Sequence, residues 1–172
     1  MDQTLNTASA AESLPLFKDI LALGADLRVR VTGRSMVPFL HGGEVLIIRK
    51  VPCSSLKRGD VIFFRNQEGF PVVHRIVRRE NYDNQAVTFQ TKGDALNIPD
   101  EPVRDTEVLG KVCAVENGPG CLNLDTGIGS TINYLLAMFS LFESRLSLVA
   151  RAVKHAVRAC GMGGTGSLPG KS

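Results

Sequence analysis

The sequence predicts a mainly β protein: a coiled antiparallel sheet with a short N-terminal helix and a C-terminal amphipathic helix. Short apolar or alternating runs recur at close, even spacing between residues 26 and 115, with turn residues between them. This pattern is typical of an antiparallel barrel or coiled sheet. Apolar residues recur at helical spacing in residues 13–24 and 128–159. A chain of 172 residues is long enough for one domain with a hydrophobic core.

The first helix is expected at residues 13–24, after a flexible polar tail at residues 1–12. Ser13 can cap its start, Pro15 is tolerated in the first turn, and Gly24 is a common stop signal. Because the helix is mostly apolar, we expect it to pack on the core. Contact with a membrane surface or a partner is the alternative.

The strands are expected in six short runs. The first run alternates strictly between apolar and arginine residues, and the second follows a Gly-Gly turn. The third follows a Gly-Asp turn, a hairpin-like loop at residues 66–69 leads into the fourth, and a turn at residues 81–84 leads into the fifth. The expected strands are residues 27–31, 44–49, 61–64, 72–77, 86–90 and 107–115.

The last third of the chain changes character after a Gly/Pro breaker at residues 116–120. Apolar residues between 128 and 159 follow one helical stripe, while Arg151, Lys154 and Arg158 share another face. This basic helix, or pair of helices, is expected to pack against the sheet, and docking on anionic lipid is the rival interpretation. The expected division is a tail and short helix (1–25), a β domain (26–116), and a linker, basic helix and flexible Gly-rich tail (117–172).

Composition argues against several classes of protein. A net charge of +3 gives no reason to expect nucleic-acid binding. The cysteines form no CxxC pair and lack zinc-ligand spacing with a histidine, so we expect separate thiols in a reducing compartment, with no metal and no cofactor. The N-terminus lacks the features of a secretory signal, and no stretch reaches the roughly 18–20 apolar residues of a membrane span. We therefore expect a cytoplasmic or peripherally membrane-associated protein. The cysteines are Cys53, Cys113, Cys121 and Cys160.

Ser35 is the first candidate for chemistry. It follows the first expected strand, in the segment GRSMVP at residues 33–38. Gly33 permits close backbone approach, and Pro38 fixes one dihedral angle and favours an extended form in the residue before it. Such a turn can hold a serine hydroxyl outward, with the Ser35 amide directed at a developing oxyanion. By itself, a serine in a turn is more often structural than catalytic.

His74 is the second candidate. It lies in the run PVVHRIV at residues 71–77, where alternation places it on one face with Val72 and Ile76. A histidine can take the proton of a serine hydroxyl and make it nucleophilic, although a lone histidine on an apolar strand is more often a packed residue. His41, in a glycine turn, and His155, on the basic helix, are weaker candidates.

The segment TKGDALNIPD at residues 91–100 supplies the acids. It is polar and rich in turn residues, so an ordinary capping loop is the simpler interpretation. Either Asp94 or Asp100 could accept a hydrogen bond from the His74 ring and hold its tautomer. Serine, histidine and aspartate are the residue types of a hydrolytic triad.

Together these segments resemble the signal peptidase I family in the broad sense, and its relatives, the self-cleaving domains of SOS-type repressors. Ser35-Met36-Val37-Pro38 is similar to the Ser-Met-x-Pro nucleophile box, and residues 56–62 resemble the Gly-Asp-Val strand box. His74-Arg75 stands where bacterial members carry Lys-Arg, residues 92–100 resemble the Gly-Asp segment, and residues 108–112 resemble the closing strand. The order and spacing of these pieces are more specific than any one of them.

Histidine in place of lysine resembles the endoplasmic-reticulum and archaeal branch of the family, which works with Ser, His and Asp. The resemblance implies Ser35 as nucleophile, His74 as general base and Asp100 as the acid that orients the histidine. It implies Asp94 as a second essential aspartate that holds the loop. It also implies a coiled all-β catalytic core and a serine endopeptidase that cleaves signal or leader peptides through an acyl-enzyme.

Two departures from the family pattern leave alternatives open. Arg34 replaces the small residue that usually precedes the serine, so the second oxyanion donor stays open, and the usual N-terminal transmembrane anchor is not evident. Peripheral membrane contact would then come from the helix at residues 13–24 or from the basic C-terminal helix. One alternative is a non-catalytic module that binds a peptide, partner or membrane on the same fold. Another is a self-cleaving regulator, although too few residues precede Asp26 for a DNA-binding helix pair.

Overall fold

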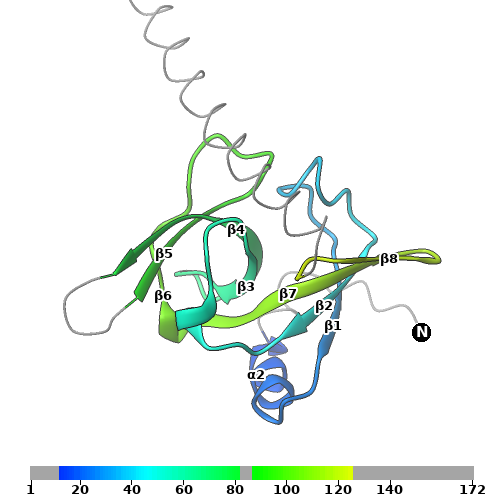
Figure 1. Cartoon of the computed structure of the whole chain (residues 1–172), viewed down its shortest axis with the longest axis horizontal. Helices are drawn as coiled ribbons and strands as arrows, with labels where there is room; N and C mark the ends of the chain where they lie inside the picture. Colours follow the sequence, from blue (N-terminus) through cyan, green and yellow to red (C-terminus); the bar gives the residue numbers. More distant parts are fainter. Residues whose placement is uncertain (1–11, 82–86, 126–172) are drawn as a thin grey trace, which may run out of the picture.

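The computed structural model describes residues 12–81 and 87–125. Within these residues, eight strands form one curled antiparallel sheet, with helix α2 (Leu14–Ala22) at one end of it (Figure 1). The strand order is β1-β2-β7-β3-β4-β5-β6, with β8 paired to β7. The mainly β class predicted from the sequence is therefore confirmed. The predicted helix at residues 128–159 and the predicted tails lie outside the described residues.

Six strands correspond to the six predicted runs, and two short strands were not predicted. Strand β8 lies beyond the Gly/Pro segment, which is the turn of a β7–β8 hairpin rather than the end of the sheet; Gly118 in this turn adopts a φ of 55°. Strand β6 has two residues, too few for an alternating pattern. The strands are β1 (Leu27–Arg30), β2 (Val45–Arg49), β3 (Val61–Arg65), β4 (Pro71–Asn81), β5 (Val87–Lys92), β6 (Val103–Arg104), β7 (Val108–Asn117) and β8 (Gly120–Asn123). Two short 3₁₀ helices, η1 (Cys53–Ser55) and η2 (Asp105–Glu107), precede β3 and β7.

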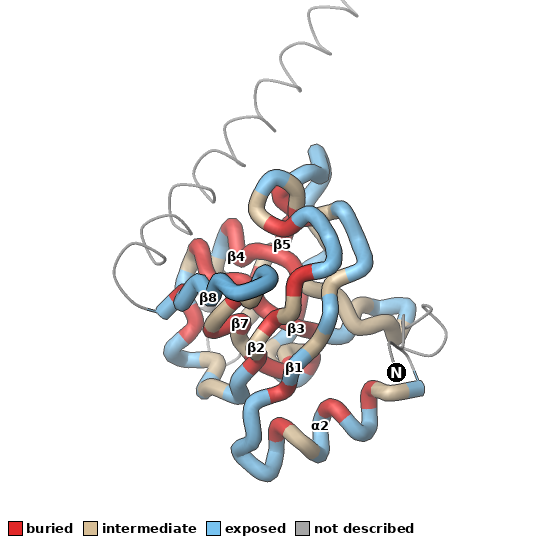
Figure 2. Tube along the Cα trace, turned by 90° about the vertical axis from the view of Figure 1, so that its right-hand side faces the viewer, coloured by how far each residue is buried: buried red, intermediate tan, exposed pale blue. Residues whose placement is uncertain are grey.

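Helix α2 packs on the core, as its apolar stripe predicts. Its buried residues are Leu14, Phe17 and Leu21, which lie at helical spacing. Figure 2 shows these buried positions recurring along α2, below the buried strands. Ser13 occupies the N-cap position without a capping hydrogen bond from its side chain, and Gly24, with a φ of 78°, follows the helix end. No helix among the described residues is long and apolar enough to cross a membrane.

The core consists of two apolar clusters, one on each side of the sheet's central strands. The cluster between α2 and the sheet includes Phe63, and Val73 packs against it. The cluster enclosed by the curl of β3 to β6 includes Phe64 and Ile76. Alternation along β3 and β4 therefore sends successive side chains to different clusters, as predicted for β4. His74 and Arg75 consequently leave β4 on opposite faces.

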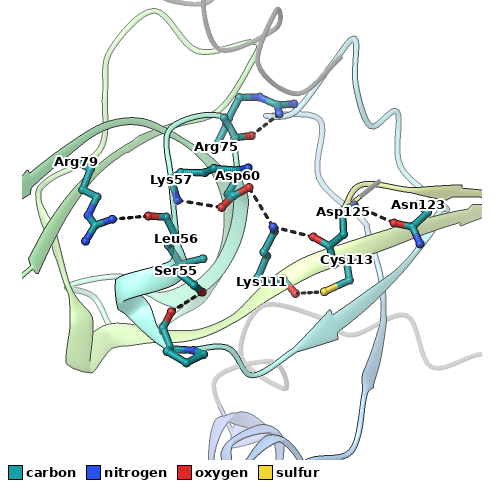
Figure 3. A network of polar contacts seen from close by, with 12 residues as sticks. Ser55, Leu56, Lys57, Asp60, Arg75, Arg79, Lys111, Cys113, Asn123 and Asp125 are labelled. Carbon is teal, nitrogen blue, oxygen red and sulfur yellow. Dashed lines mark hydrogen bonds and ion pairs between the residues drawn. The ribbon is translucent and has the colours of Figure 1, made fainter. Parts of the chain in front are cut away.

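Lys111 on β7 lies between two carboxylates (Figure 3). Its Nζ is 3.1 Å from Oδ1 of Asp60 and 2.7 Å from Oδ1 of Asp125. Burial alone would raise the pKa of Asp125, but hydrogen bonds from Lys111 and Cys113, and the nearby positive charges, lower it below its ordinary value. Burial and the Asp125 carboxylate raise the pKa of the Cys113 thiol to about 11, so this thiol is neutral at physiological pH. The network joins β7 to the turn before β3 and to the end of the described chain.

The substitution Asp125→Asn should remove part of the pH dependence of stability. A carboxylate whose folded pKa lies below its unfolded pKa stabilises the protein above the unfolded value, and this contribution is lost as the pH falls through the folded value. The free energy of unfolding of wild type should therefore exceed that of the variant by a constant amount above about pH 5, and the difference should shrink below about pH 3. Urea unfolding over a pH range that extends above about pH 5 and below about pH 3 measures it, and a difference that does not change with pH would contradict the prediction.

Candidate active site

The loop between β1 and β2 carries Ser35, and its ends are held together. The amide of Val31 donates to the carbonyl of Glu44, and the amide of Gly43 donates to the carbonyl of Val31, both at 2.8 Å. The buried carboxylate of Glu44 accepts hydrogen bonds from the amides of His41 and Gly42, at 2.9 and 2.8 Å. This buried carboxylate therefore fixes the glycine turn that precedes β2.

Two buried side chains anchor the middle of this loop. Met36 and Leu40 are 2% and 0% exposed, and the amide of Leu40 donates to the carbonyl of Met36. Ser35 is half-buried beside them, whereas Arg34 is exposed. The Arg34 side chain therefore occupies solvent rather than the core, so the fold accommodates a large residue before the serine.

Ser35, His74 and Asp100 form a continuous line of hydrogen bonds. Oγ of Ser35 lies 3.0 Å from Nε2 of His74, and Nδ1 of His74 lies 2.6 Å from Oδ2 of Asp100. His74 is 6% exposed. A carboxylate can only accept a hydrogen bond, so the neutral His74 ring carries its hydrogen on Nδ1, facing Asp100. Its Nε2 is then free to accept a hydrogen bond from the Ser35 hydroxyl.

Asp100 is held by β5 (Val87–Lys92), at the point where the loop after this strand returns to it. The buried hydroxyl of Thr91 donates to Oδ2 of Asp100 at 2.7 Å, and the amide of Asp100 donates to the carbonyl of Thr91 at 2.9 Å. The side-chain amide of Gln90 donates to the carbonyl of Asp100. Thr91 and Gln90 were not predicted as supports of the site, because no pattern in the sequence indicates that residue 100 returns beside residue 91.

Asp94 lies on the other face of β4, bound to Arg75. The guanidinium of Arg75 donates through Nε and Nη2 to the two carboxylate oxygens of Asp94, at 2.9 and 2.7 Å. Its Nη1 donates to the carbonyl of Gly59 at 3.0 Å, and the guanidinium lies 4.7 Å from the centre of the Phe39 ring. Of the two candidate acids, the structure thus places Asp100 at the His74 ring and Asp94 at the neighbouring arginine.

Gly93 brings the backbone of the loop after β5 directly against the serine and the histidine. The amide of Ala95 donates to the carbonyl of Ser35 at 2.8 Å. A Cβ atom on Gly93 would lie 2.6 Å from the carbonyl oxygen of Ser35 and 3.0 Å from Nε2 of His74. Real Cβ atoms do not approach backbone atoms so closely, so this position requires a residue without a side chain.

The other candidate residues lie apart from this line. The His41 side chain is 68% exposed and lies 4.0 Å from Glu44. His155 lies outside the described residues. Cys53, Cys113 and Cys121 are free thiols. Within residues 12–81 and 87–125, no group of three His, Cys, Asp or Glu residues could hold a metal ion.

Ser35 and His74 border a largely apolar pocket of about 350 Å³. Residues from α2, β1, β2, β3 and β4 line it. His74 and Asp100 also border a second hollow of about 290 Å³, whose lining includes Asn66, Gln67 and Glu101. The histidine therefore stands between an apolar pocket on the serine side and a more polar one on the aspartate side. Lining residues of the apolar pocket include Phe17, Val29, Val31, Met36, Leu40, Leu46, Phe63 and Val73.

The substitution Asp94→Ala should destabilise the protein strongly. It would leave the Arg75 guanidinium, which is 0% exposed, without its carboxylate. Removing one partner of a buried ion pair costs about 3–5 kcal/mol. Denaturant unfolding measures the loss; Glu116→Ala, which breaks the exposed pair with Arg28, is the control and should cost less than about 1 kcal/mol. Equal losses in the two variants would contradict the prediction.

The substitution Gly93→Ala should separate Ser35 from His74. The added methyl group cannot occupy its ideal position without moving the Ser35 carbonyl or the His74 ring. In a crystal structure of the variant, the Oγ–Nε2 distance should exceed 3.5 Å instead of the 3.0 Å of wild type. Gly120→Ala, in exposed β8, is the control and should leave the distance unchanged. An unchanged distance in Gly93→Ala would show that the loop is less tightly constrained.

Comparisons with known proteins place the chain in a family. A family model described as Peptidase S24-like matches residues 3–113, more than half of the chain and all of the residues in the Ser35–His74–Asp100 line. The chain is also 29% identical over 102 residues to the signal peptidase complex catalytic subunit SEC11C of Homo sapiens, Mus musculus and Canis lupus familiaris. The match covers 57% of this chain and 53% of each relative, so the chain spans about half the length of the curated relatives it matches. The chain belongs to the Peptidase S24-like family.

Proposed function

We propose that this protein is a serine endopeptidase of the signal-peptidase type, with Ser35 as nucleophile, His74 as general base and Asp100 as the orienting acid. The observation that carries the proposal is the hydrogen-bonded line from Ser35 Oγ through the His74 ring to Asp100. Its members come from two loops and a strand that lie far apart in the sequence. Any buried histidine needs hydrogen-bond partners at its ring nitrogens, but a serine hydroxyl at Nε2 and a carboxylate at Nδ1 is the specific arrangement of a hydrolytic triad.

In the proposed reaction, Nε2 of His74 takes the proton of Ser35 as Oγ attacks the carbonyl carbon of a peptide bond. Asp100 holds the ring in the required tautomer and stabilises the imidazolium that forms. His74 then gives the proton to the leaving amine, which leaves an acyl group on Ser35. A water molecule deprotonated by His74 attacks this ester, the bond between Ser35 Oγ and the acyl carbon breaks, and His74 returns the proton to Oγ as the second product leaves. The Ser35 amide is the proposed donor to the oxyanion.

Asp94 has a positioning role in this proposal. It does not bond to the His74 ring but neutralises Arg75, the next residue along β4. Because Gly93 contacts both Ser35 and His74, the Asp94–Arg75 pair would hold the loop that sets their separation. Loss of Asp94 would therefore reduce activity through the geometry of the site.

The proposed substrate is a protein with a signal or leader segment. The apolar pocket beside Ser35 suits apolar side chains of an extended peptide. The relatives are named as catalytic subunits of a signal peptidase complex, which agrees with this class of substrate. We propose peripheral contact with a membrane as the setting, because signal segments are delivered there.

The rival proposal, a non-catalytic binding module on the same fold, would gain if Ser35 and His74 could not reach hydrogen-bond distance. Their separation of 3.0 Å favours the endopeptidase instead.

Ser35→Ala and His74→Ala should each lower kcat for signal-peptide substrates to a small residual rate, on the order of 10⁶-fold below wild type, and Asp100→Asn should reduce kcat on the order of 100-fold or more. All three variants should remain folded. Cleavage is measured by mass spectrometry of peptide products, which also locates the cut. Ser54→Ala and His41→Ala, at exposed positions outside the site, are matched controls and should retain wild-type rates. Full activity in Ser35→Ala would refute the proposed nucleophile.

A further inference from the structure

The short helix α2 borders the pocket that contains Ser35. Phe17, on the buried face of α2, is part of the wall of the 350 Å³ pocket. Another hollow, of about 330 Å³ and distinct from the one beside Asp100, lies between α2 and β1, and Phe17 lines it too. The two hollows share Phe17, Val29, Arg30 and Thr32, so they adjoin. Together they form one groove that runs from Ser35 along β1 to α2, which we call the α2 groove.

The position of Phe17 in this groove is fixed by the core. Its ring lies 5.8 Å from the ring of Phe63 on β3, and the residue is 8% exposed. Leu14 and Leu21 bury the same face of the helix in the same cluster. A side chain held in this way cannot swing aside for a ligand without unpacking the helix. The volume of residue 17 therefore sets the width of the groove at this point.

The α2 groove is largely apolar next to Ser35 and mixed next to α2, where Ser13, Arg28 and Arg30 also line it. Val29, Met36 and Val73 line the part next to Ser35. Leu16, which is 58% exposed, lines the outer part next to α2. Because the groove begins at the nucleophile, its occupant is the same polypeptide that is cut at Ser35. Strand β1 is the terminal strand in the described sheet order, so an extended chain can run along its outer edge.

We propose that α2 forms the outer wall of the substrate groove and that Phe17 determines the size of the apolar substrate side chain accepted next to the scissile bond. This inference rests on the proposed endopeptidase function and adds a determinant of its specificity. Phe17 limits the size of this side chain because its ring forms part of the wall of the 350 Å³ pocket beside Ser35. Phe17 is a specificity-determining residue in this account and takes no part in the chemistry.

The test changes the volume of residue 17 in both directions. The probes are fluorescein-labelled decapeptides of glycine and serine. Each carries a single alanine, leucine or phenylalanine, and the set places this residue at each position in turn. Their binding is measured by fluorescence anisotropy in the Ser35→Ala background, so that cleavage does not interfere. Phe17→Ala should raise the affinity for the phenylalanine peptide relative to the alanine peptide by about 10-fold. Phe17→Trp should shift the same ratio in the opposite direction.

Leu23→Ala is the matched control, because Leu23 is the C-cap residue directly after α2, is 86% exposed and lines neither hollow. It should leave the affinity ratio within about twofold of the parent, since the carbon atoms that it removes are exposed and line neither hollow. If Phe17→Ala does not fold, Phe17→Leu keeps the helix packed and should give a smaller shift in the same direction. If Phe17 had only a structural role, Phe17→Ala and Phe17→Trp would lower stability but would not shift the affinity ratio of the phenylalanine and alanine peptides in opposite directions.

Two outcomes would overturn the inference: an affinity ratio that moves in neither Phe17 variant, or no binding of any peptide. Cleavage of the same peptides by the protein with Ser35 intact tests the proposed function separately. Cleavage with an unchanged size preference would refute the role of Phe17 alone. A shifted binding preference without cleavage would refute the endopeptidase and keep the groove.

Discussion

The arrangement of the site depends on one buried cation, the guanidinium of Arg75. Removing a charge from water costs free energy unless the charge is paired and hydrogen-bonded. The Arg75 side chain is 0% exposed, so it needs hydrogen-bond acceptors and a counter-charge within the protein. Arg75 takes two hydrogen-bond acceptors from Asp94, one from the carbonyl of Gly59, and a ring contact from Phe39. These partners belong to three different loops. The need to satisfy one ion therefore holds the serine loop, the turn before β3 and the loop after β5 around β4.

His74 benefits from this constraint because it is the preceding residue on the same strand. The register of β4 pairs Arg75 with Lys92, so Gly93 and Asp94 leave β5 beside the histidine. Asp94 turns to the arginine, and the bare backbone of Gly93 closes on Ser35 and His74. The loop then returns to β5, where hydrogen bonds from Thr91 and Gln90 hold Asp100. Asp94, the structural carboxylate, and Asp100, the proposed catalytic one, thus belong to the same short loop but lie on opposite faces of β4.

Local patterns predicted the parts of the fold that depend on local physics. Alternation and turn residues located six strands, and the apolar stripe predicted that α2 packs on the core, because burial imposes these periods on any sheet or helix. The β7–β8 hairpin was not predicted, because glycine and proline form a tight turn as readily as they end a sheet. The residues alone left Asp94 and Asp100 open as partners of His74, since both lie in one turn-rich loop and only strand register separates them. Neither Thr91 nor the place of Phe17 beside Ser35 had a sequence signal, because both depend on contacts between distant segments.

The central claim is that Ser35 and His74 act as one catalytic unit, and a double-variant cycle on kcat tests it most directly. Residues that perform a single step together lose nearly all of their effect when either one is removed. The account predicts that the residual rate of the Ser35→Ala, His74→Ala variant equals that of each single variant within about threefold. If the losses of the two single variants multiply in the double variant, the two residues act independently, and the account of the site would be wrong.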